Sequence, residues 1–246
     1  MDNTHAASAG QPEFSAPSRA QMRKNIFTLS WPAAIELMLS STISLINMWL
    51  VSSLGAEAVS AVGITTQPIM IPWVLIQAFS IGGTAIIARS LGEKNELAAR
   101  RASEQMIFLA SGASILCSAI LFFFGGSIII RMGATPDYLS MAELYIKFSA
   151  IGVIFQSITT TIAAIMRGAG RTRLTMRFNI ISNIVNVSIG FPLIYGLGPI
   201  PSLGILGAGI AILTAHIVGC TLALLTLFRS KSLPNTRIQA GFLNLI

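Results

Sequence analysis

Six long apolar runs, separated by short polar segments, constrain the fold of this 246-residue chain more than any other feature. The runs span residues 26–50, 61–88, 104–128, 139–165, 176–196 and 203–228. Each is long enough to cross the ~30 Å hydrocarbon core of a bilayer as a helix, which takes about 20 mostly apolar residues. They are too long, and alternate too little in polarity, to be strands of a membrane β-barrel. The sequence therefore predicts an all-α, polytopic membrane protein with six transmembrane helices.

The positively charged residues predict how these helices are oriented. Fourteen of the sixteen Lys and Arg residues lie before the first run or after the second, fourth and sixth. They are Arg19, Arg23, Lys24, Arg89, Lys94, Arg100, Arg101, Arg167, Arg171, Arg173, Arg177, Arg229, Lys231 and Arg237. The connections 51–60 and 196–203 contain none, and the third contains Arg131, with Lys147 farther into the next run. Because basic loops stay cytoplasmic, we predict six spans with both termini in the cytoplasm.

Composition excludes several classes of function. The chain is 53% hydrophobic and 10% charged, whereas a soluble domain is about 25% charged. The net charge of +7 lies in loops beside the membrane, without interleaved aromatic residues. We therefore attribute it to topology and to attraction by lipid headgroups, and expect no nucleic-acid partner. The sequence has no plausible catalytic triad, clustered Cys/His ligands or Walker motif, so we predict neither an enzyme nor a bound metal.

Three segments follow one another along the chain. Residues 1–24 are polar and contain Gly, Pro and Ser, so we expect a disordered cytoplasmic N-terminus. Residues 25–228 form the six-helix unit, and residues 229–246 form a cytoplasmic linker. Within the unit, i,i+4 charge pairs predict a short surface helix over 89–103. Gly168 and Gly170 predict a turn in the segment 167–177.

Small residues and prolines predict how the helices pack and bend. The small residues recur every fourth position on the sixth run, which lets a neighbouring backbone approach closely; they are Gly207, Ala211, Ala215 and Gly219. Pro68 and Pro72 remove amide donors from successive turns of the second run, so that helix should bend.

Three asparagines share one face of the fifth run. Asn179, Asn183 and Asn186 occupy positions i, i+4 and i+7. Amides that face lipid are costly, so these side chains must face protein or water. They either make interhelical hydrogen bonds, worth about 0.6 kcal/mol each on average, or line a polar cavity. Three amides on one stripe favour the cavity wall.

Glu36 is the one acidic residue well inside the first apolar run, about ten residues or ~15 Å from its start. A carboxyl group at that depth must find a partner or hold a proton, because desolvation disfavours its charged form. Glu36 is therefore a protonation or substrate-cation site, or a group bonded to a neighbouring helix. Asn47 lies three turns along nearly the same face, and Gln67 is a further candidate for the lumen. His216 is either a satisfied core residue or a second proton carrier.

Several segments resemble the multidrug and toxic compound extrusion (MATE) family of secondary transporters. They are LINMWLVSSLGAEAVSAVGI after Pro32, GGTAIIARSLGEKNELAARRA, RMGATPDYLSMAELYI, MRGAGRTRLTMRFNIISNIVN and LGILGAGIAILTAHIVG. The agreement covers residues 25–228 in the expected order. The resemblance implies one lobe of a transporter built from two six-helix lobes. Residues 229–246 would then lead toward a second lobe, which is either covalently attached or another chain.

The resemblance also carries expectations about the cation site, and the chain departs from them. Many members have an Asp where this chain has Asn47, an acidic residue where it has Gly190, and a Thr where it has Ile212. Asn186 matches the family's asparagine on the fifth helix. The family's N-lobe cation site is therefore not carried over, apart from Asn186.

The resemblance implies an exporter in the plasma (inner) membrane that uses an H⁺ or Na⁺ gradient, with no other cofactor, to expel small organic, often cationic, compounds. Two alternatives remain open. One is a flippase for lipid-linked or polyisoprenoid substrates, which shares the general architecture. A strongly cationic cavity would favour this function, but the sequence places almost no Lys or Arg in the spans. A half-protein without transport activity, serving as a remnant or assembly subunit, is the other.

Overall fold

Six helices make up the regular secondary structure of the part of the chain that the computed structural model describes, residues 19–196 and 201–229. They are α1 (Arg19–Ser52), α2 (Ala56–Gly92), α3 (Glu96–Arg131), α4 (Pro136–Gly168), α5 (Thr172–Tyr195) and α6 (Ile205–Arg229). Each contains a segment long and apolar enough to cross a membrane. The prediction of an all-α protein with six transmembrane helices is confirmed.

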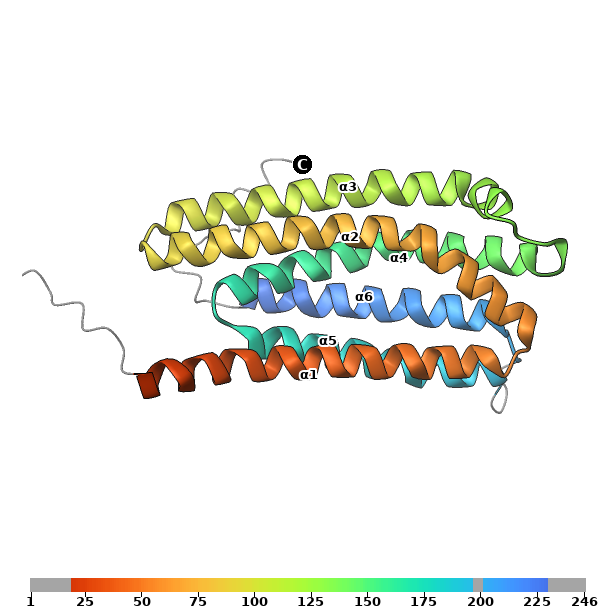
Figure 1. Cartoon of the computed structure of the whole chain (residues 1–246), viewed down its shortest axis with the longest axis horizontal. Helices are drawn as coiled ribbons and strands as arrows, with labels where there is room; N and C mark the ends of the chain where they lie inside the picture. The colour runs from red at the N-terminus through yellow and green to blue at the C-terminus, as the bar shows by residue number, and fades with distance from the viewer. Residues whose placement is uncertain (1–18, 197–200, 230–246) are drawn as a thin grey trace, which may run out of the picture.

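The helices run side by side along the long axis of the molecule, with their connections at its two ends (Figure 1). The α1–α2, α3–α4 and α5–α6 connections lie at one end, and the α2–α3 and α4–α5 turns lie at the other. Helix α4 is central because it packs against α2, α3 and α6. In its apolar segment 61% of the residues are buried, compared with 11% in that of α1. Helix α1 packs mainly against α5 and touches α2 little, which leaves a cleft between α1 and α2.

Two of the boundaries predicted from sequence are wrong. Helix α1 begins at Arg19, so residues 19–24 are helical, whereas residues 1–18 lie outside the described part of the chain. The segment 89–103 is no separate surface helix, because α2 continues to Gly92 and α3 begins at Glu96. The turn between them is closed by Asn95, whose side chain accepts a hydrogen bond from the amide of Ala98 at 3.0 Å. Most of the linker, residues 230–246, also lies outside the described residues.

The predicted packing features are present. A Cβ atom on Gly207 would lie 2.5 Å from the carbonyl oxygen of Leu193, so only glycine lets α5 approach α6 this closely. Farther along the same seam, the hydroxyl of Ser182 donates to the carbonyl of Ala215 at 2.6 Å. The first part of α2 runs at an angle to the rest of the helix (Figure 1), consistent with prolines inside it. Gly170 closes the α4–α5 turn with a φ of 73°.

Candidate functional site

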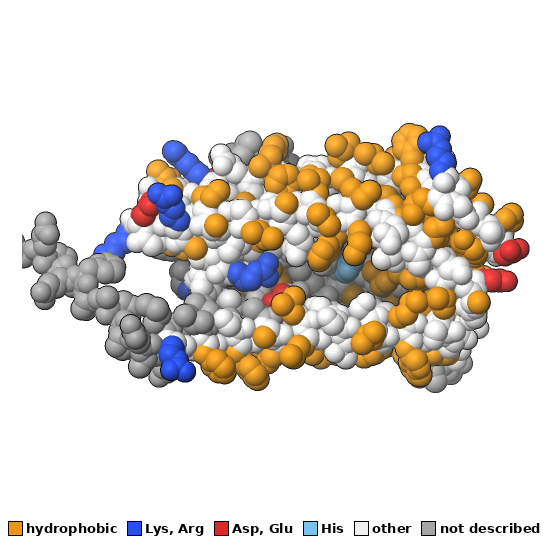
Figure 2. Space-filling view, in the orientation of Figure 1, with side chains coloured by type: hydrophobic (Ala, Val, Ile, Leu, Met, Phe, Trp, Pro, Cys, Tyr) orange, Lys and Arg blue, Asp and Glu red, His pale blue; other side chains and the backbone are white. Residues whose placement is uncertain are grey.

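The cleft between α1 and α2 contains three cavities that share lining residues. Their volumes are about 630, 440 and 440 Å³. Ser40 lines the first and second, Thr66 and Tyr145 line the first and third, and Trp73 and Gln156 line the second and third. The cavities therefore form a continuous hollow, whose floor comes from α4, α5 and α6. Figure 2 shows this hollow, with an acidic, a basic and a histidine side chain inside it.

Polar stripes on two helices line the hollow. On α1, lining residues recur at i, i+4, i+8 and i+11 and thus share one face; they are Glu36, Ser40, Ser44 and Asn47. On α4 a spacing of i, i+4, i+7 and i+11 brings three polar residues and one alanine to one face; they are Gln156, Thr160, Ala163 and Arg167. Each of the two helices thus presents polar side chains to the cavities, beside apolar ones such as Leu37 and Leu45 of α1.

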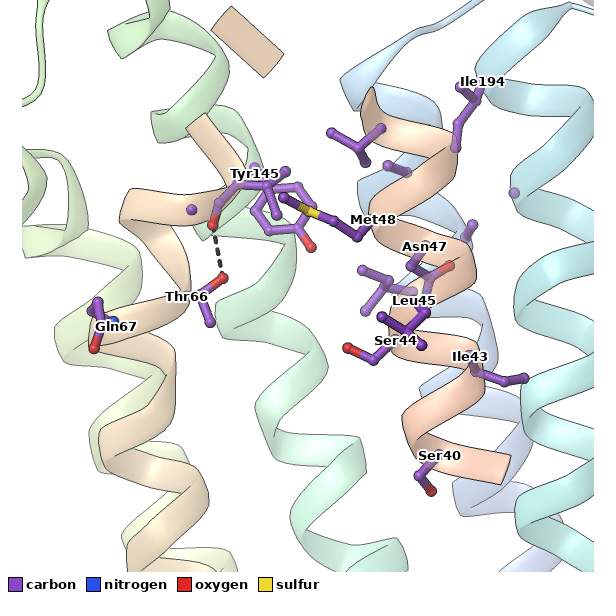
Figure 3. A pocket seen from close by; sticks show the side chains of 17 residues that line it. Ser40, Ile43, Ser44, Leu45, Asn47, Met48, Thr66, Gln67, Tyr145 and Ile194 are labelled. Atoms are coloured by element: carbon purple, nitrogen blue, oxygen red, sulfur yellow. Dashed lines mark hydrogen bonds between the residues drawn. The ribbon is translucent and has the colours of Figure 1, made fainter. Parts of the chain in front are cut away.

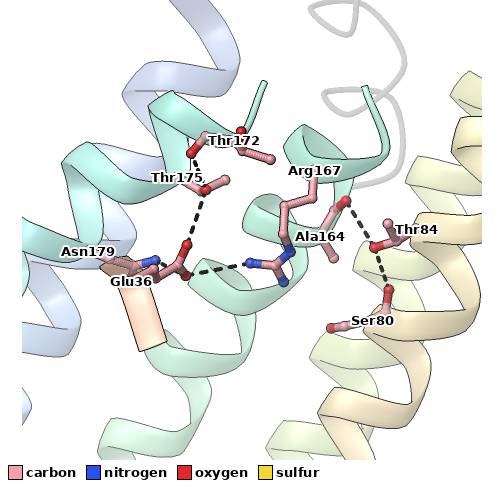
Figure 4. Close-up of polar contacts among 8 residues, drawn as sticks. All are labelled: Glu36, Ser80, Thr84, Ala164, Arg167, Thr172, Thr175 and Asn179. Atoms are coloured by element: carbon pink, nitrogen blue, oxygen red, sulfur yellow. Dashed lines mark hydrogen bonds and ion pairs between the residues drawn. The ribbon is translucent and has the colours of Figure 1, made fainter. Parts of the chain in front are cut away.

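The second cavity, of about 440 Å³, contains the strongest polar cluster of the described residues (Figure 4). The amide of Asn179 on α5 donates to Oε1 of Glu36 at 2.7 Å. The guanidinium of Arg167 on α4 approaches the same oxygen, at 3.6 Å. The hydroxyl of Thr175 lies 3.4 Å from Oε2 and also 2.7 Å from the carbonyl oxygen of Thr172. A hydroxyl has one proton, so the shorter contact holds it, and the longer contact to the carboxylate is weak.

The position of Glu36 follows from these partners. Arg167 lies in the last turn of α4, and Thr175 lies in the first turn of α5. Glu36 is therefore near the end of the bundle that holds the α4–α5 turn. Its side chain is 17% exposed, and that of Arg167 is 29% exposed. The carboxyl group has found partners on two neighbouring helices, one of the two outcomes expected for it.

The three asparagines of α5 have different surroundings. Asn179 lines the cavity and bonds to Glu36. Asn183 is half-buried and is not among the residues that line the three cavities. Asn186 is buried, and its Oδ1 has no hydrogen-bond partner among the described residues. On this one face of α5, Asn179 thus lines a cavity, Asn183 is half-buried and Asn186 is buried. Of the three, only Asn179 is part of the wall of these cavities.

The largest of these three cavities lies toward the other end of the cleft (Figure 3). Asn47 is half-buried on its α1 side, Gln67 is exposed at its α2 edge, and Tyr145 of α4 lies between the two helices. Gly190 and Ile212 also line it. The three positions where the chain departs from the MATE cation-site pattern therefore line one cavity. Asn47 supplies an amide there, Gly190 has no side chain, and Ile212 supplies an aliphatic side chain.

His216 lies in the third cavity, which it lines from α6. Its Nδ1 is 3.2 Å from the carbonyl oxygen of Gly152 on α4. A Cβ at position 152 would lie 3.0 Å from the same nitrogen, so the glycine gives the ring its space. His216 thus has a backbone partner and a face toward the cleft, which suits both roles considered for it.

Sequence reasoning missed Arg167, Thr175 and Trp73. Arg167 was assigned to a cytoplasmic basic segment, although it stands eleven residues after Gln156 and so shares its face. That periodicity is the signal that could have placed it in the cavity. Thr175 and Trp73 carry no comparable signal, because a threonine in a first turn and a tryptophan in a span are common in membrane helices.

Comparisons with known proteins agree with this architecture. The sequence model of the MatE family matches residues 32–191. A probable multidrug resistance protein NorM of Thermotoga maritima is 27% identical over 211 residues, which cover 86% of this chain and 46% of that protein. A FAD transporter of Shewanella oneidensis is 26% identical over 210 residues, covering 83% and 45%. The chain spans about half the length of the curated relatives it matches.

Solved structures show the same fold. A MATE transporter of Vibrio cholerae superposes with a TM-score of 0.79 at 17% identity, covering 91% of this chain and 50% of that one. A MATE protein in its bent conformation gives 0.78 at 23% identity, with 85% and 46% covered. The six helices thus correspond to one lobe of a MATE-type transporter. Because the family model extends over well more than half of the sequence, this chain belongs to the MatE family.

Proposed function

We propose that this chain is one lobe of a cation-coupled exporter of small organic compounds in the plasma (inner) membrane, with both termini in the cytoplasm. The observation that carries the proposal is the hollow between α1 and α2, lined by both polar and apolar side chains, in a chain of the MatE family. A protein that only packs against lipid has no need of a hollow lined by a carboxylate, a guanidinium and several amides, which are costly to bury.

A second six-helix lobe completes the transporter in this proposal. The chain covers 46% of the NorM relative, so a lobe of similar size, attached covalently or supplied by another chain, would account for the rest. The two lobes rock against each other and expose the hollow alternately to the two sides of the membrane. An H⁺ or Na⁺ gradient biases this exchange by binding one orientation more strongly than the other.

Glu36 is the principal ionisable site of this lobe in the proposal. The positions that many MATE proteins fill with acids are Asn47 and Gly190, whereas Glu36 is a carboxyl group that faces the hollow. A flippase for lipid-linked substrates is less favoured, because Arg167 is the one Lys or Arg that lines the three cavities and its charge is balanced by Glu36.

Ethidium efflux from cells tests the proposal, with the chain expressed together with a C-terminal lobe. We expect gradient-dependent efflux that Glu36→Gln abolishes or strongly reduces, since glutamine keeps the hydrogen bonds but cannot change charge. Glu57→Gln, at an exposed acidic residue in the first turn of α2, is the matched control and should retain wild-type efflux. Wild-type rate and pH dependence in Glu36→Gln would place the coupling site elsewhere. Absence of efflux with the second lobe present would support a transport-inactive half-protein.

A further inference from the structure

The cavity around Glu36 presents two opposite charges, side by side, to the same space. Oε1 of Glu36 and the guanidinium of Arg167 are 3.6 Å apart, and both residues line the cavity of about 440 Å³. That separation is longer than the ~2.7–2.9 Å of a charge-assisted hydrogen bond, so the pair is loosely held. A guanidinium has five N–H donors. Among the described residues, the Arg167 guanidinium has the Glu36 carboxylate as its polar partner. Some of its N–H donors therefore remain available to a ligand.

Charge balance decides which ligand this pair can accept. In the state that binds the organic ligand, with Glu36 ionised, an organic cation that binds Glu36 leaves the guanidinium without its counter-charge, and an organic anion on Arg167 does the same to the carboxylate. Removing one partner of a partly buried ion pair is costly, because the other charge remains uncompensated. A ligand with both charges avoids this cost: its ammonium group faces Glu36 while its carboxylate takes the free donors of Arg167 in a bidentate contact.

The spacing of the charges narrows the ligand further. In an α-amino acid the ammonium nitrogen and the carboxylate carbon are bonded to the same carbon atom and lie about 2.5 Å apart. Both charges of such a ligand can therefore lie beside the Glu36–Arg167 pair, whose nearest charged atoms are 3.6 Å apart. The two dipoles can therefore align antiparallel while the protein's own pair stays in place. Leu37 and Trp73 offer apolar surface in the same cavity, and Gln156 offers an amide. An aromatic or aliphatic group on the ligand can pack against Leu37 and Trp73.

We propose that the cavity formed by Glu36, Arg167, Asn179 and Trp73 is a subsite for small zwitterions with an α-amino-acid-type head and an apolar group. The proposal rests on the proposed export function, whose substrate class it specifies. It differs from the general expectation of cationic substrates, which follows from family resemblance and not from this pair of charges. The cavity volume lies in the range of about 300–1,000 Å³ that is usual for small-molecule sites.

Three probes on one carbon skeleton test the proposal. Phenylalanine carries both charges, phenethylamine only the positive one, and 3-phenylpropanoate only the negative one. Binding of radiolabelled phenylalanine to the purified 246-residue chain in lipid nanodiscs, and its displacement by the other two, gives three affinities. We expect phenylalanine to bind about tenfold more tightly than either singly charged probe, because only phenylalanine preserves the charge balance. Equal or tighter binding of phenethylamine, or no binding of any probe, would overturn the proposal.

Variants locate the effect at the pair. Arg167→Gln should remove the advantage of phenylalanine over phenethylamine, and Glu36→Gln its advantage over 3-phenylpropanoate. Arg173→Gln, at an exposed arginine in the first turn of α5, and Glu57→Gln are the matched controls and should bind all three probes as wild type does. The double variant Glu36→Gln/Arg167→Gln leaves no unpaired charge and provides a folded reference if a single variant misfolds. An unchanged order of affinities in that variant would assign binding to the apolar surface alone.

This binding experiment separates the subsite from the export function. Selective phenylalanine binding in a chain that shows no efflux with a second lobe would leave the subsite standing and remove the export proposal. Efflux of ethidium, without any preference for phenylalanine in the binding experiment, would support the export proposal and overturn the subsite.

Discussion

At the scale of single residues, Glu36 joins three helices. It belongs to α1, accepts a hydrogen bond from Asn179 on α5 and pairs with Arg167 on α4. Helix α1 touches α2 little and packs chiefly on α5, and this cluster attaches it to both α4 and α5 through polar contacts. A polar contact of this kind contributes both to stability and to the fixed position of the carboxylate.

Asn179→Ala should lower the free energy of unfolding by about 1 kcal/mol, between the ~0.6 kcal/mol average of interhelical bonds in membranes and the larger value of bonds to charged groups. The reason is the loss of the 2.7 Å bond to Glu36. Asn183→Ala, one turn along the same face, is the control and should change stability less. Thermal or denaturant unfolding in detergent measures both. A larger loss for Asn183→Ala would show that the stripe stabilises the fold through another contact.

At the scale of the helices, close packing of α5 and α6 depends on positions that have no room for a side chain. A Cβ on Gly207 meets backbone atoms of Leu193 at 2.5 and 2.6 Å, and backbone cannot move aside as a flexible side chain can. By contrast, a Cβ on Gly112 of α3 would have nothing within 4 Å. Gly207 and Gly112 look alike in the sequence, since both lie inside apolar runs, but their surroundings in the structure differ.

Gly207→Ala should therefore destabilise the chain by about 1–3 kcal/mol, the usual cost of overpacking. Gly112→Ala should be neutral or stabilising by up to ~1 kcal/mol, because alanine favours the helix and meets no neighbour. Melting temperatures of the two variants in the same detergent make the comparison. Equal effects would mean that the α5–α6 seam relaxes to accept the extra methyl group.

The helices could be predicted from sequence because length and hydropathy alone determine a membrane span. The ridge on α6 could be predicted too, since small residues every four positions mark one face. The site could be predicted only in part. Glu36 and Asn179 stand out as polar groups in apolar runs. Their contact, however, depends on how α1 packs against α5, and no local sequence pattern encodes that packing. Arg167 was hidden because a basic residue at a helix end fits the charge rule equally well.

At the scale of the whole molecule, the two kinds of connection lie at opposite ends of the bundle (Figure 1). The α2–α3 and α4–α5 turns, which are flanked by Lys and Arg, lie at one end, and the segments 51–60 and 196–203, which contain neither, belong to connections at the other. Ser53 and Ser202 are exposed at the end that holds the α1–α2 and α5–α6 connections, and Lys94 is exposed in the α2–α3 turn at the other. From the positive-inside rule we predict that the Lys94 end lies in the cytoplasm.

Single cysteines at these three positions, in a chain whose Cys117 and Cys220 are replaced, measure the orientation. An impermeant maleimide applied to intact cells should label positions 53 and 202 but not position 94. Labelling of position 94 after the cells are opened is the control for its reactivity. The reverse pattern in intact cells would invert the topology and place both termini outside.

The pairing of Glu36 with Arg167 has a consequence for the membrane potential. Moving one elementary charge across the membrane field involves about 2.3 kcal/mol per 100 mV. A carboxylate and a guanidinium 3.6 Å apart carry no net charge, so a lobe that rocks with the pair intact does almost no electrical work at this point. A zwitterion in the cavity preserves that neutrality. The resting voltage of the cell would then neither drive nor oppose this part of the cycle, and the work would come from the coupling ion.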